Sequence, residues 1–463
     1  MLFKPKFQLL LLGYFISLVT FGQQYTGPEI PPDSVKVRNI KDVFIHGETE
    51  GHIRNYFMAT WNQGELSDYY ANAIGARLGF HTALYRGFRF GLAGLFTYNA
   101  FSSNLTEPDP LSSKLPRYEL ELFDVEAPEN KADLDRLYEL YLEYQTKQVK
   151  ATIGRFSFTS PLINPQDGRM KPYSVQGISV EIPVIQKSKI ILAWFNHFSP
   201  RSTVSWHQAG ESVGIYPVGV DENGRPSGYK SQVQSNGVAV AGFQWKKRGL
   251  LKSEAWNYWI ENVSNTTYSR ILLEVKPKVR IGAEGLYQSQ VGSGGNPESA
   301  LAYFPDQRQW LAGGMLAYEP ANWYFSANYL HLGADGRFLF PREFGREQFF
   351  VTTPRGRLEG LGKSNALAFR VRKSLPHKLT TEAALTKTWL PAYNDFRFNK
   401  YGATSYWNGL IDLTYKPDFE PLNGLSFRLL YVSRLSPNTK LPLEKRFYNT
   451  NFHHFNFVSQ LTF

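Results

Sequence analysis

Residues 451–463, which end the chain, read Asn451-Phe-His-His-Phe-Asn-Phe-Val-Ser-Gln-Leu-Thr-Phe463. Side chains alternate between the two faces of a β-strand. One face of this stretch carries Phe455, Phe457, Leu461 and Phe463 with His453 and Ser459, and the other face is more polar. The pattern predicts a strand with one mostly apolar face and an aromatic carboxyl terminus. Bacterial outer-membrane barrels characteristically close on such a strand.

The start of the chain indicates export. Lys4 and Lys6 precede an apolar run from Phe7 to Phe21, and small residues lead to Gly22. A basic start, a short apolar core and a small-residue exit are typical of a secretory signal peptide. We expect a signal peptide over residues 1–22, cleaved after Gly22, with an uncleaved signal anchor as the alternative. The run is too short for a comfortable spanning helix.

Composition narrows the class of protein. No later stretch offers the ~20 consecutive apolar residues of a membrane helix, so a helical membrane protein is excluded. Aromatic residues make up 15% of the chain, and barrels use such residues at both membrane interfaces. The chain has no cysteine, which excludes disulfides, thiol chemistry and cysteine-ligated metals. The formal charge of +11 is spread along the chain, which suits a pore wall better than a nucleic-acid partner.

The rest of the chain predicts an all-β protein, an antiparallel transmembrane barrel of about 18 strands. Most segments are close to the ~9–11 residues that a tilted membrane strand needs. Short and long connections alternate, as short periplasmic turns and long external loops should. We therefore expect a periplasmic leader at 23–41 and a barrel at 42–463, with residue 463 beside the first strand. The expected strands are 43–60, 69–82, 87–100, 136–147, 149–156, 174–181, 189–197, 236–246, 252–261, 266–276, 278–290, 309–318, 321–333, 363–373, 378–389, 404–416, 423–434 and 451–463.

The charged face of each strand is expected to face the lumen. An ionised side chain that faces lipid costs about 2–4 kcal/mol near the midplane. In the first strand this rule places Ile53 outside and Arg54 inside. Strand 252–261 is less clear, because Trp256, Tyr258 and Ile260 on one face oppose Ala255, Trp259 and Glu261 on the other.

A family resemblance lies at the fifth strand and the loop that follows it. The stretch Gly154-Arg155-Phe-Ser-Phe-Thr-Ser160-Pro161-Leu-Ile-Asn-Pro-Gln-Asp167-Gly168-Arg169-Met170-Lys-Pro172, followed by Gly177, resembles the third-loop region of OprD-family outer-membrane porins. Residues 137–144 resemble the fourth strand of that family. The resemblance implies an eighteen-stranded barrel that admits small solutes. It also implies an inward-folded third loop and a ladder of basic residues that guides carboxylates. Arg155 departs from this pattern, because strict alternation puts it on the lipid face.

The expected site is a constriction lined by basic side chains. We expect the third loop, 157–173, to fold into the lumen, so that Asp167 and Arg169 approach Arg280, Arg370 or Arg372. Pro161, Pro165 and Pro172 stop this loop from continuing the strand ladder. Lumen acids accompany the bases, but few are expected near those after residue 278. A positive stripe that favours anions is therefore predicted. The basic residues placed on the lumen phase are Arg77, Lys278, Arg280, Arg370, Arg372, Arg428 and Arg434.

The function predicted is an outer-membrane porin for passive or weakly selective diffusion of small solutes, preferably carboxylates. Two alternatives stay open: a barrel enzyme that hydrolyses lipid, and a sealed adhesion or assembly barrel. No catalytic motif, metal site or cofactor site is expected. The acidic loop 104–135 either binds divalent cations together with lipopolysaccharide or is a solvated charge run. Expected partners are outer-membrane lipid, lipopolysaccharide, small solutes and the barrel-assembly machinery, which would engage the strand ending at Phe463.

Overall fold

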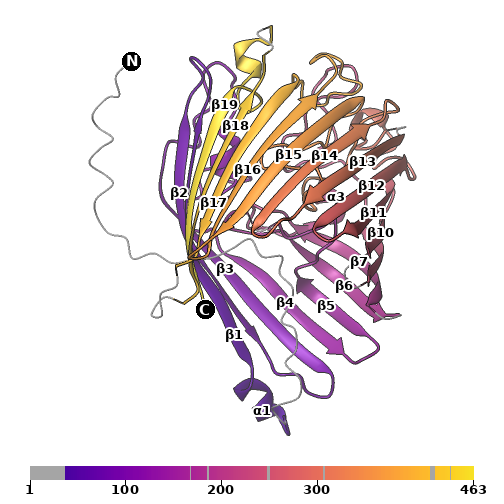
Figure 1. Cartoon of the computed structure of the whole chain (residues 1–463). Coiled ribbons are helices and arrows are strands. Elements are labelled where there is room, and N and C mark those ends of the chain that lie inside the picture. Colours follow the sequence, from indigo (N-terminus) through magenta and orange to yellow (C-terminus); the bar gives the residue numbers. More distant parts are fainter. Residues whose placement is uncertain are drawn as a thin grey trace.

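The chain forms one closed antiparallel barrel. The computed structural model describes residues 37–463 except 167, 185–186, 248–250, 306–307, 418–422 and 438–439. Nineteen strands make a single sheet. The two-residue β8 (His207–Gln208) lies in a loop, and β7 pairs directly with β9, so the wall has eighteen strands, as predicted. Figure 1 shows the tilted strands of the wall.

The strands match the expected segments closely along the whole chain. Bulges interrupt the register at a few positions, such as between Asn72 and Ala73 of β2. The wall strands are β1 (Glu48–Trp61), β2 (Tyr69–His81), β3 (Phe88–Ser102), β4 (Arg136–Gln145), β5 (Lys150–Phe156), β6 (Ser174–Pro183), β7 (Ser188–Ser199), β9 (Val238–Lys247), β10 (Leu251–Ile260), β11 (Ser264–Lys276), β12 (Val279–Gln290), β13 (Arg308–Tyr318), β14 (Trp323–Leu332), β15 (Ser364–Leu375), β16 (Leu379–Trp389), β17 (Tyr406–Tyr415), β18 (Leu425–Leu435) and β19 (Phe452–Thr462).

The last strand closes the barrel against the first. β19 pairs antiparallel with β1, with Thr462 opposite His52 and His453 opposite Trp61. Gly51 and Phe463 exchange two backbone hydrogen bonds, of 2.9 and 3.0 Å. Closure leaves the wall without a free edge, whose unpaired backbone groups lipid could not satisfy. The predicted pairing of residue 463 beside the first strand is confirmed.

The expected strand start at residue 43 is wrong, because a short helix precedes β1. α1 (Ile40–Ile45) begins after Asn39, whose side chain accepts a hydrogen bond from the Asp42 backbone N–H at 3.0 Å. An asparagine at this position favours a helix start, since it satisfies an otherwise unpaired donor. The Phe44 ring of α1 stacks on Phe80 of β2, with ring centroids 6.3 Å apart.

The inward and outward faces follow the predicted charge rule. Ile53 is 50% exposed on the outer face, whereas Arg54 is 4% exposed on the inner face. Arg155 shares the outer face with the exposed Ile153, and its guanidinium lies 4.6 Å from the Trp206 ring centroid. Arg155 therefore does not line the interior. Among the described residues, no helix is long and apolar enough to cross a membrane.

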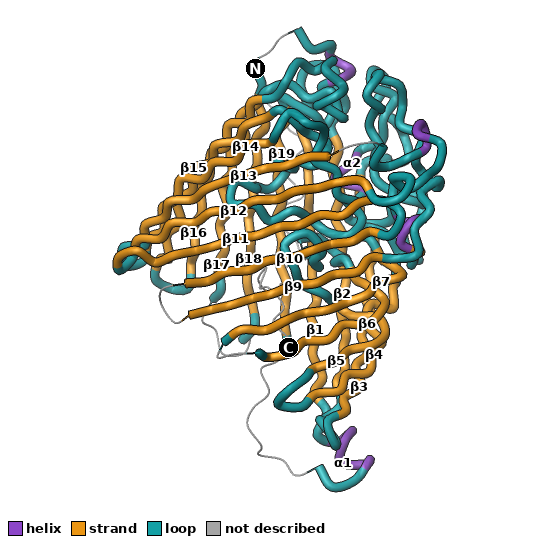
Figure 2. The backbone as a smooth tube through the Cα atoms, turned by 90° about the vertical axis from the view of Figure 1, so that its right-hand side faces the viewer, coloured by secondary structure: helices purple, strands orange, loops and turns teal. Residues whose placement is uncertain are grey.

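Long loops gather at one end of the strands (Figure 2), and several of them enter the barrel. Tyr258 of β10 donates a hydrogen bond to Ser160 at 3.0 Å, and Tyr56 of β1 donates one to the Gly168 carbonyl at 3.1 Å. Both tyrosines are buried on the inner face of the wall. Ser160 and Gly168 of the third loop therefore contact the inner faces of β10 and β1, respectively.

Part of the interior is an apolar core rather than open space. Trp256, Tyr258 and Ile260 of β10 face inward and are almost fully buried, which settles the unclear strand 252–261. The Tyr258 ring packs edge-on against Phe340 of loop 333–363, with ring centroids 5.5 Å apart. Phe158 of the third loop packs edge-on against Trp256 at 6.4 Å. The loops therefore bury apolar side chains against the inner wall of β10.

Candidate functional site

Arg169 of the third loop lies inside the barrel, next to the loop that joins β3 to β4. α2 (Arg117–Leu120) is a single turn of that loop, and it places Tyr118 and Glu121 in the interior. The Arg169 guanidinium forms a short ion pair with the Glu121 carboxylate and donates to the Tyr118 carbonyl at 3.4 Å. Arg54 of β1 donates to the Arg169 carbonyl and so ties the loop to the wall.

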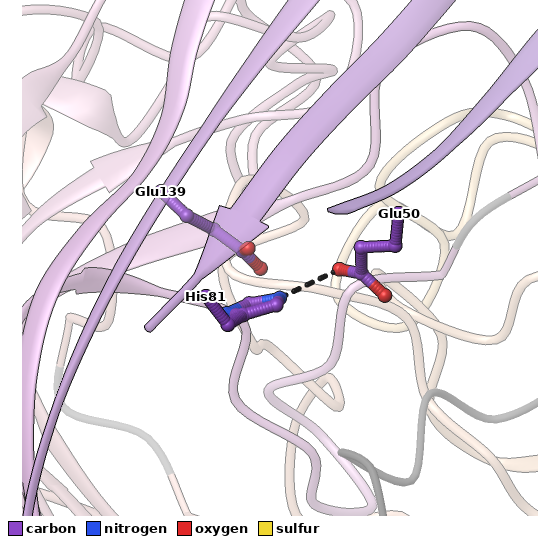
Figure 3. Close-up of side chains that lie close together, drawn as sticks. All are labelled: Glu50, His81 and Glu139. Atoms are coloured by element: carbon purple, nitrogen blue, oxygen red, sulfur yellow. Dashed lines mark hydrogen bonds and ion pairs between the residues drawn. The ribbon is translucent and has the colours of Figure 1, made fainter. Parts of the chain in front are cut away.

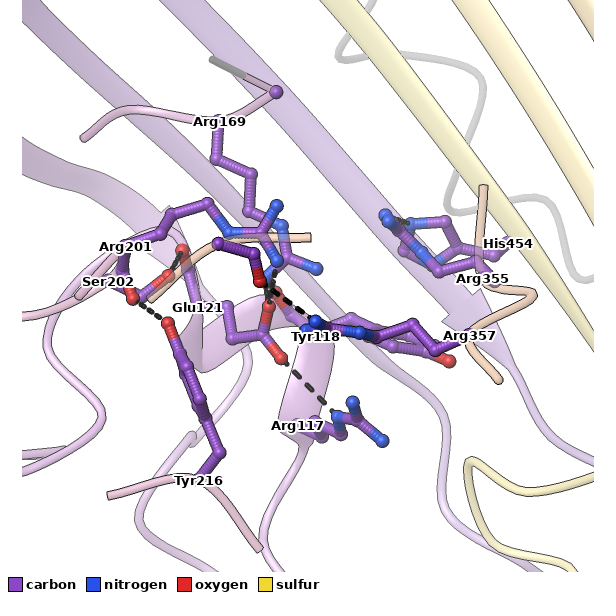
Figure 4. Close-up of polar contacts among 12 residues, drawn as sticks. Arg117, Tyr118, Glu121, Arg169, Arg201, Ser202, Tyr216, Arg355, Arg357 and His454 are labelled. Atoms are coloured by element: carbon purple, nitrogen blue, oxygen red, sulfur yellow. Dashed lines mark hydrogen bonds and ion pairs between the residues drawn. The ribbon is translucent and has the colours of Figure 1, made fainter. Parts of the chain in front are cut away.

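Further arginines from two other loops surround Glu121 (Figure 4). Arg201, which follows β7, pairs with the Glu121 carboxylate at 3.0 Å, and Arg117 does so at 3.3 Å. Loop 333–363 contributes the rest, whose charges act on Arg169, Arg201 and each other. The arginine cluster, as we define it, consists of Arg117, Arg169, Arg201, Arg346, Arg355 and Arg357.

The arginine cluster holds more positive than negative charge. Glu121 and Glu347 are its paired acids, and Glu347 binds Arg357 at 3.1 Å. Burial raises the pKa of Glu121, but the charges of Arg169, Arg201 and other arginines outweigh it and lower the pKa to about 2. Burial, more than the neighbouring charges, lowers the pKa of Arg169 to about 9. Burying like charges together is costly without anions, so the site favours a negative ligand.

Several donors of the cluster are also unsatisfied. The Nε atoms of Arg169, Arg201, Arg346 and Arg355 have no hydrogen-bond partner among the described residues. The hydroxyl of Tyr173, whose ring lies 5.5 Å from the Arg201 guanidinium, has none either. Buried polar groups are normally paired, so unsatisfied donors on buried arginines indicate capacity for an acceptor. Guanidinium groups suit carboxylates in particular, because they can bind them through two parallel hydrogen bonds.

A second buried acid, Glu119, lies on the wall side of the same turn. It accepts a hydrogen bond from Thr60 of β1 at 2.6 Å and a short one from the Tyr448 hydroxyl. Burial raises the pKa of Glu119 to about 7, although these hydrogen bonds oppose the rise. Thr60 also contacts His454 of β19 at 2.8 Å, and His454 contacts Arg355. Glu119 is thus a titratable group beside the arginine cluster.

Arg77 of β2 links neighbouring strands of the wall through ion pairs. It pairs with Glu50 of β1 at 2.7 Å and with Glu139 of β4 at 2.9 Å. Glu50 also contacts His81 at 2.8 Å (Figure 3). The donor atoms of Glu50, His81 and Glu139 lie within 4.8 Å of one another, which is metal-ligand spacing. The Arg77 guanidinium already pairs with both carboxylates, so these residues fit a network that links three strands better than a metal site.

The other predicted wall residues pair locally, which corrects the expected unbalanced stripe. Arg280 binds Glu319 at 2.9 Å, and Arg428 binds Asp412 through contacts of 2.5–3.2 Å. Glu382 of β16 lies 3.6 Å from Arg370 and 2.9 Å from Arg372. These acids lie on neighbouring strands or turns and cancel much of the charge. Lys278 is exposed at a turn, and the Arg434 guanidinium lies 3.7 Å from the Tyr406 ring centroid.

The prediction that Arg169 of the third loop approaches Arg280, Arg370 or Arg372 is also wrong. Its contacts reach Tyr118, Glu121 and Arg54 instead. Arg370 donates to the Phe350 carbonyl at 3.4 Å, so loop 333–363 occupies its end of the wall. Asp167 lies outside the described residues.

Sequence reasoning missed most of the arginine cluster because its members lie on loops. Arg346, Arg355 and Arg357 belong to 333–363, which sequence length alone marked as an external connection. One signal was available: this loop alternates arginine with large apolar residues such as Phe344 and Phe349. A loop so rich in apolar side chains is poorly suited to water, and here it is buried in the barrel.

Comparisons with known proteins show the fold. No family model and no curated protein sequence matches the chain. Pseudomonas aeruginosa OccK9 (OpdG) is similar with a TM-score of 0.70 and 12% identity, over 91% of this chain and 99% of that chain. The P. aeruginosa OpdK structure with vanillate has a TM-score of 0.67 and 15% identity, over 91% and 99%. The P. aeruginosa OccK2 (OpdF) complex with glucuronate has a TM-score of 0.66 and 14% identity, over 91% and 98%.

The chain has the fold of the OprD-family outer-membrane channels. The predicted resemblance is confirmed at this level and covers nearly the whole barrel. At 12–15% identity, the likeness does not carry site residues from one chain to the other.

Proposed function

We propose that the protein is an outer-membrane channel for small carboxylate-bearing solutes, with the arginine cluster as its selective constriction. The observation that carries the proposal is a cluster of six arginines inside a closed barrel, three of which bind the carboxylate of Glu121. Excess positive charge in a narrow interior attracts anions and repels cations. Fold neighbours solved with vanillate and with glucuronate, both carboxylates, support the same solute class.

Bilayer recording of the purified protein tests this function. Under a potassium chloride gradient, the reversal potential should have the sign of an anion-selective pore. Liposomes that contain the protein should take up glucuronate faster than glucose, which has a similar size and no charge. Cation selectivity, or equal uptake of the two solutes, would reject the proposal.

A sealed barrel is the second candidate, and the apolar core inside the wall favours it. Phe158, Trp256, Tyr258 and Phe340 fill part of the interior with loop and wall side chains. A sealed barrel predicts no conductance in the same recordings. A conducting, anion-selective protein excludes it.

A further inference from the structure

Glu121 occupies the position in the arginine cluster that suits the carboxylate of a solute. Its carboxylate binds Arg169, Arg201 and Arg117. The side chain is 3% exposed and keeps its charge, as the low pKa shows. The protein therefore presents to its own arginines the chemical group that the proposed function assigns to the solute.

We infer that Glu121 is a built-in carboxylate ligand of the arginine cluster, which a solute carboxylate displaces when it binds. The inference rests on the proposed function and adds to it a residue that sets the affinity. Without a solute, Glu121 offsets the repulsion among Arg169, Arg201 and Arg117. An entering carboxylate takes over these contacts, while the Glu121 side chain rotates away.

The backbone around Glu121 suits an exchange that involves the side chain alone. Ser202 donates a hydrogen bond to the Glu121 carbonyl at 2.5 Å. The Val125 backbone N–H donates to the Ser202 carbonyl at 3.0 Å. On the other side of the turn, Thr60 holds Glu119 at 2.6 Å. These anchors hold the main chain in place, so α2 does not have to leave the wall for the carboxylate of Glu121 to move.

The unsatisfied donors of the cluster favour the displacement of Glu121 by a solute over a purely structural role for Glu121. Glu121 leaves the Nε atoms of Arg169, Arg201 and Arg355 without a partner among the described residues (Figure 4). Wall arginines such as Arg270 and Arg370 also have an unpaired Nε, but the cluster brings four such atoms together and so has capacity for a further acceptor. A free solute carboxylate is not tied to the main chain and can choose its orientation. It can therefore reach guanidinium faces that the tethered Glu121 does not.

Competition makes a prediction that simple electrostatics does not. Glu121→Gln removes the competing charge, so glucuronate should block single-channel current with a dissociation constant about tenfold lower than in the unmodified channel. Glu347→Gln is the matched control, because Glu347 is an equally buried acid of the cluster that pairs with Arg357. Both variants should move the reversal potential toward anions. Only Glu121→Gln should tighten the block strongly.

Equal tightening in the two variants would reduce Glu121 to one charge among others and overturn the inference. An unchanged block in Glu121→Gln would overturn it as well. Heat-dependent gel mobility reports whether each barrel is folded. If Glu121→Gln does not fold, Glu121→Asp decides: its shorter side chain competes less, so a smaller tightening is expected, and no tightening contradicts the inference. A cation-selective or silent unmodified channel would instead reject the proposed function, independently of the variants.

Discussion

Arg201 donates to Glu121 at 3.0 Å while its own Nε has no partner among the described residues. Like Arg169, it therefore both binds Glu121 and keeps a donor that a solute carboxylate could use. A charge-assisted hydrogen bond contributes about 1.5–3 kcal/mol, so we expect Arg201→Gln to weaken glucuronate block about tenfold or more. Arg372→Gln is the control, since Arg372 is half exposed and paired with Glu382. Block titrations in bilayers measure both, and equal losses would place selectivity on the wall instead of the cluster.

Glu119 should make anion selectivity depend on pH. Its pKa of about 7 lies above the ordinary 4.5, so the folded protein holds a proton in this range that the unfolded chain releases. The raised pKa of Glu119 therefore contributes stability to the fold that is fully present below about pH 4.5. This contribution is lost as the pH rises through 7. Lowering the pH from about 8 to about 6 removes a negative charge beside Arg169, and the reversal potential should move toward anions. Glu119→Gln should reduce that shift, and the part that remains belongs to Glu343 and Lys171, whose pKa values burial also moves to about 7. A shift as large in the variant as in the unmodified protein would contradict the role of Glu119.

Among the secondary-structure elements and the loops between them, Lys400 connects four loops. Its ammonium group pairs with Glu359 at 2.9 Å and lies 5.0, 5.1 and 5.4 Å from the ring centroids of Tyr229, Tyr303 and Tyr401. These residues come from the loops 200–237, 291–307, 333–363 and 390–405. Lys400 is 2% exposed, and removing its charge leaves the buried Glu359 carboxylate without a counter-charge, held by the Tyr401 hydroxyl at 2.6 Å. Such a loss costs about 3–5 kcal/mol.

Lys400→Gln should therefore loosen the outer loops and leave the wall intact. Limited proteolysis should cut the loops at least several times faster than in the unmodified protein, while heat-dependent gel mobility of the barrel stays the same. The double variant Lys400→Gln with Glu359→Gln removes both charges and should recover part of the protection. If the single variant is as resistant as the unmodified protein, this contact does not hold the loops together.

Closure of the whole molecule depends on the seam between β1 and β19. A Cβ on Gly51 would lie 2.6 Å from the Arg77 carbonyl and 2.9 Å from the Phe463 ring. We expect Gly51→Ala to destabilise the barrel by about 1–3 kcal/mol, because the backbone at the seam has to shift. Gly285→Ala is the control, since its Cβ would meet only the Leu311 carbonyl at 3.7 Å. Urea unfolding in detergent compares them, and equal stability of the two variants would contradict the tight seam.

The sequence by itself determined the barrel, its closure and the two faces of its strands. Those features depend on a two-residue period, on loop lengths and on the cost of placing charge in lipid, all of which are local properties. Arg54 inside and Ile53 outside follow from that cost alone. One ion pair could also have been predicted from the sequence, because Glu382 lies opposite Arg372 across the short turn that joins β15 and β16. That register predicts their ion pair and weakens the expected stripe.

Only the tertiary structure decided which arginines form the site. Arg169, Arg201 and Arg357 come from three loops far apart in the sequence. Arg169 and Arg201 meet at Glu121, and the charge of Arg357 acts on Arg201, only because those loops pack inside the wall. No periodic pattern encodes such packing, because the path of a loop is fixed only when its apolar side chains pack against the wall. The local start of α1 at Asn39 was missed for another reason, since a single capping side chain overrode the strand pattern. The physical boundary is thus between periodic elements, which the sequence specifies locally, and loop contacts, which the closed barrel selects.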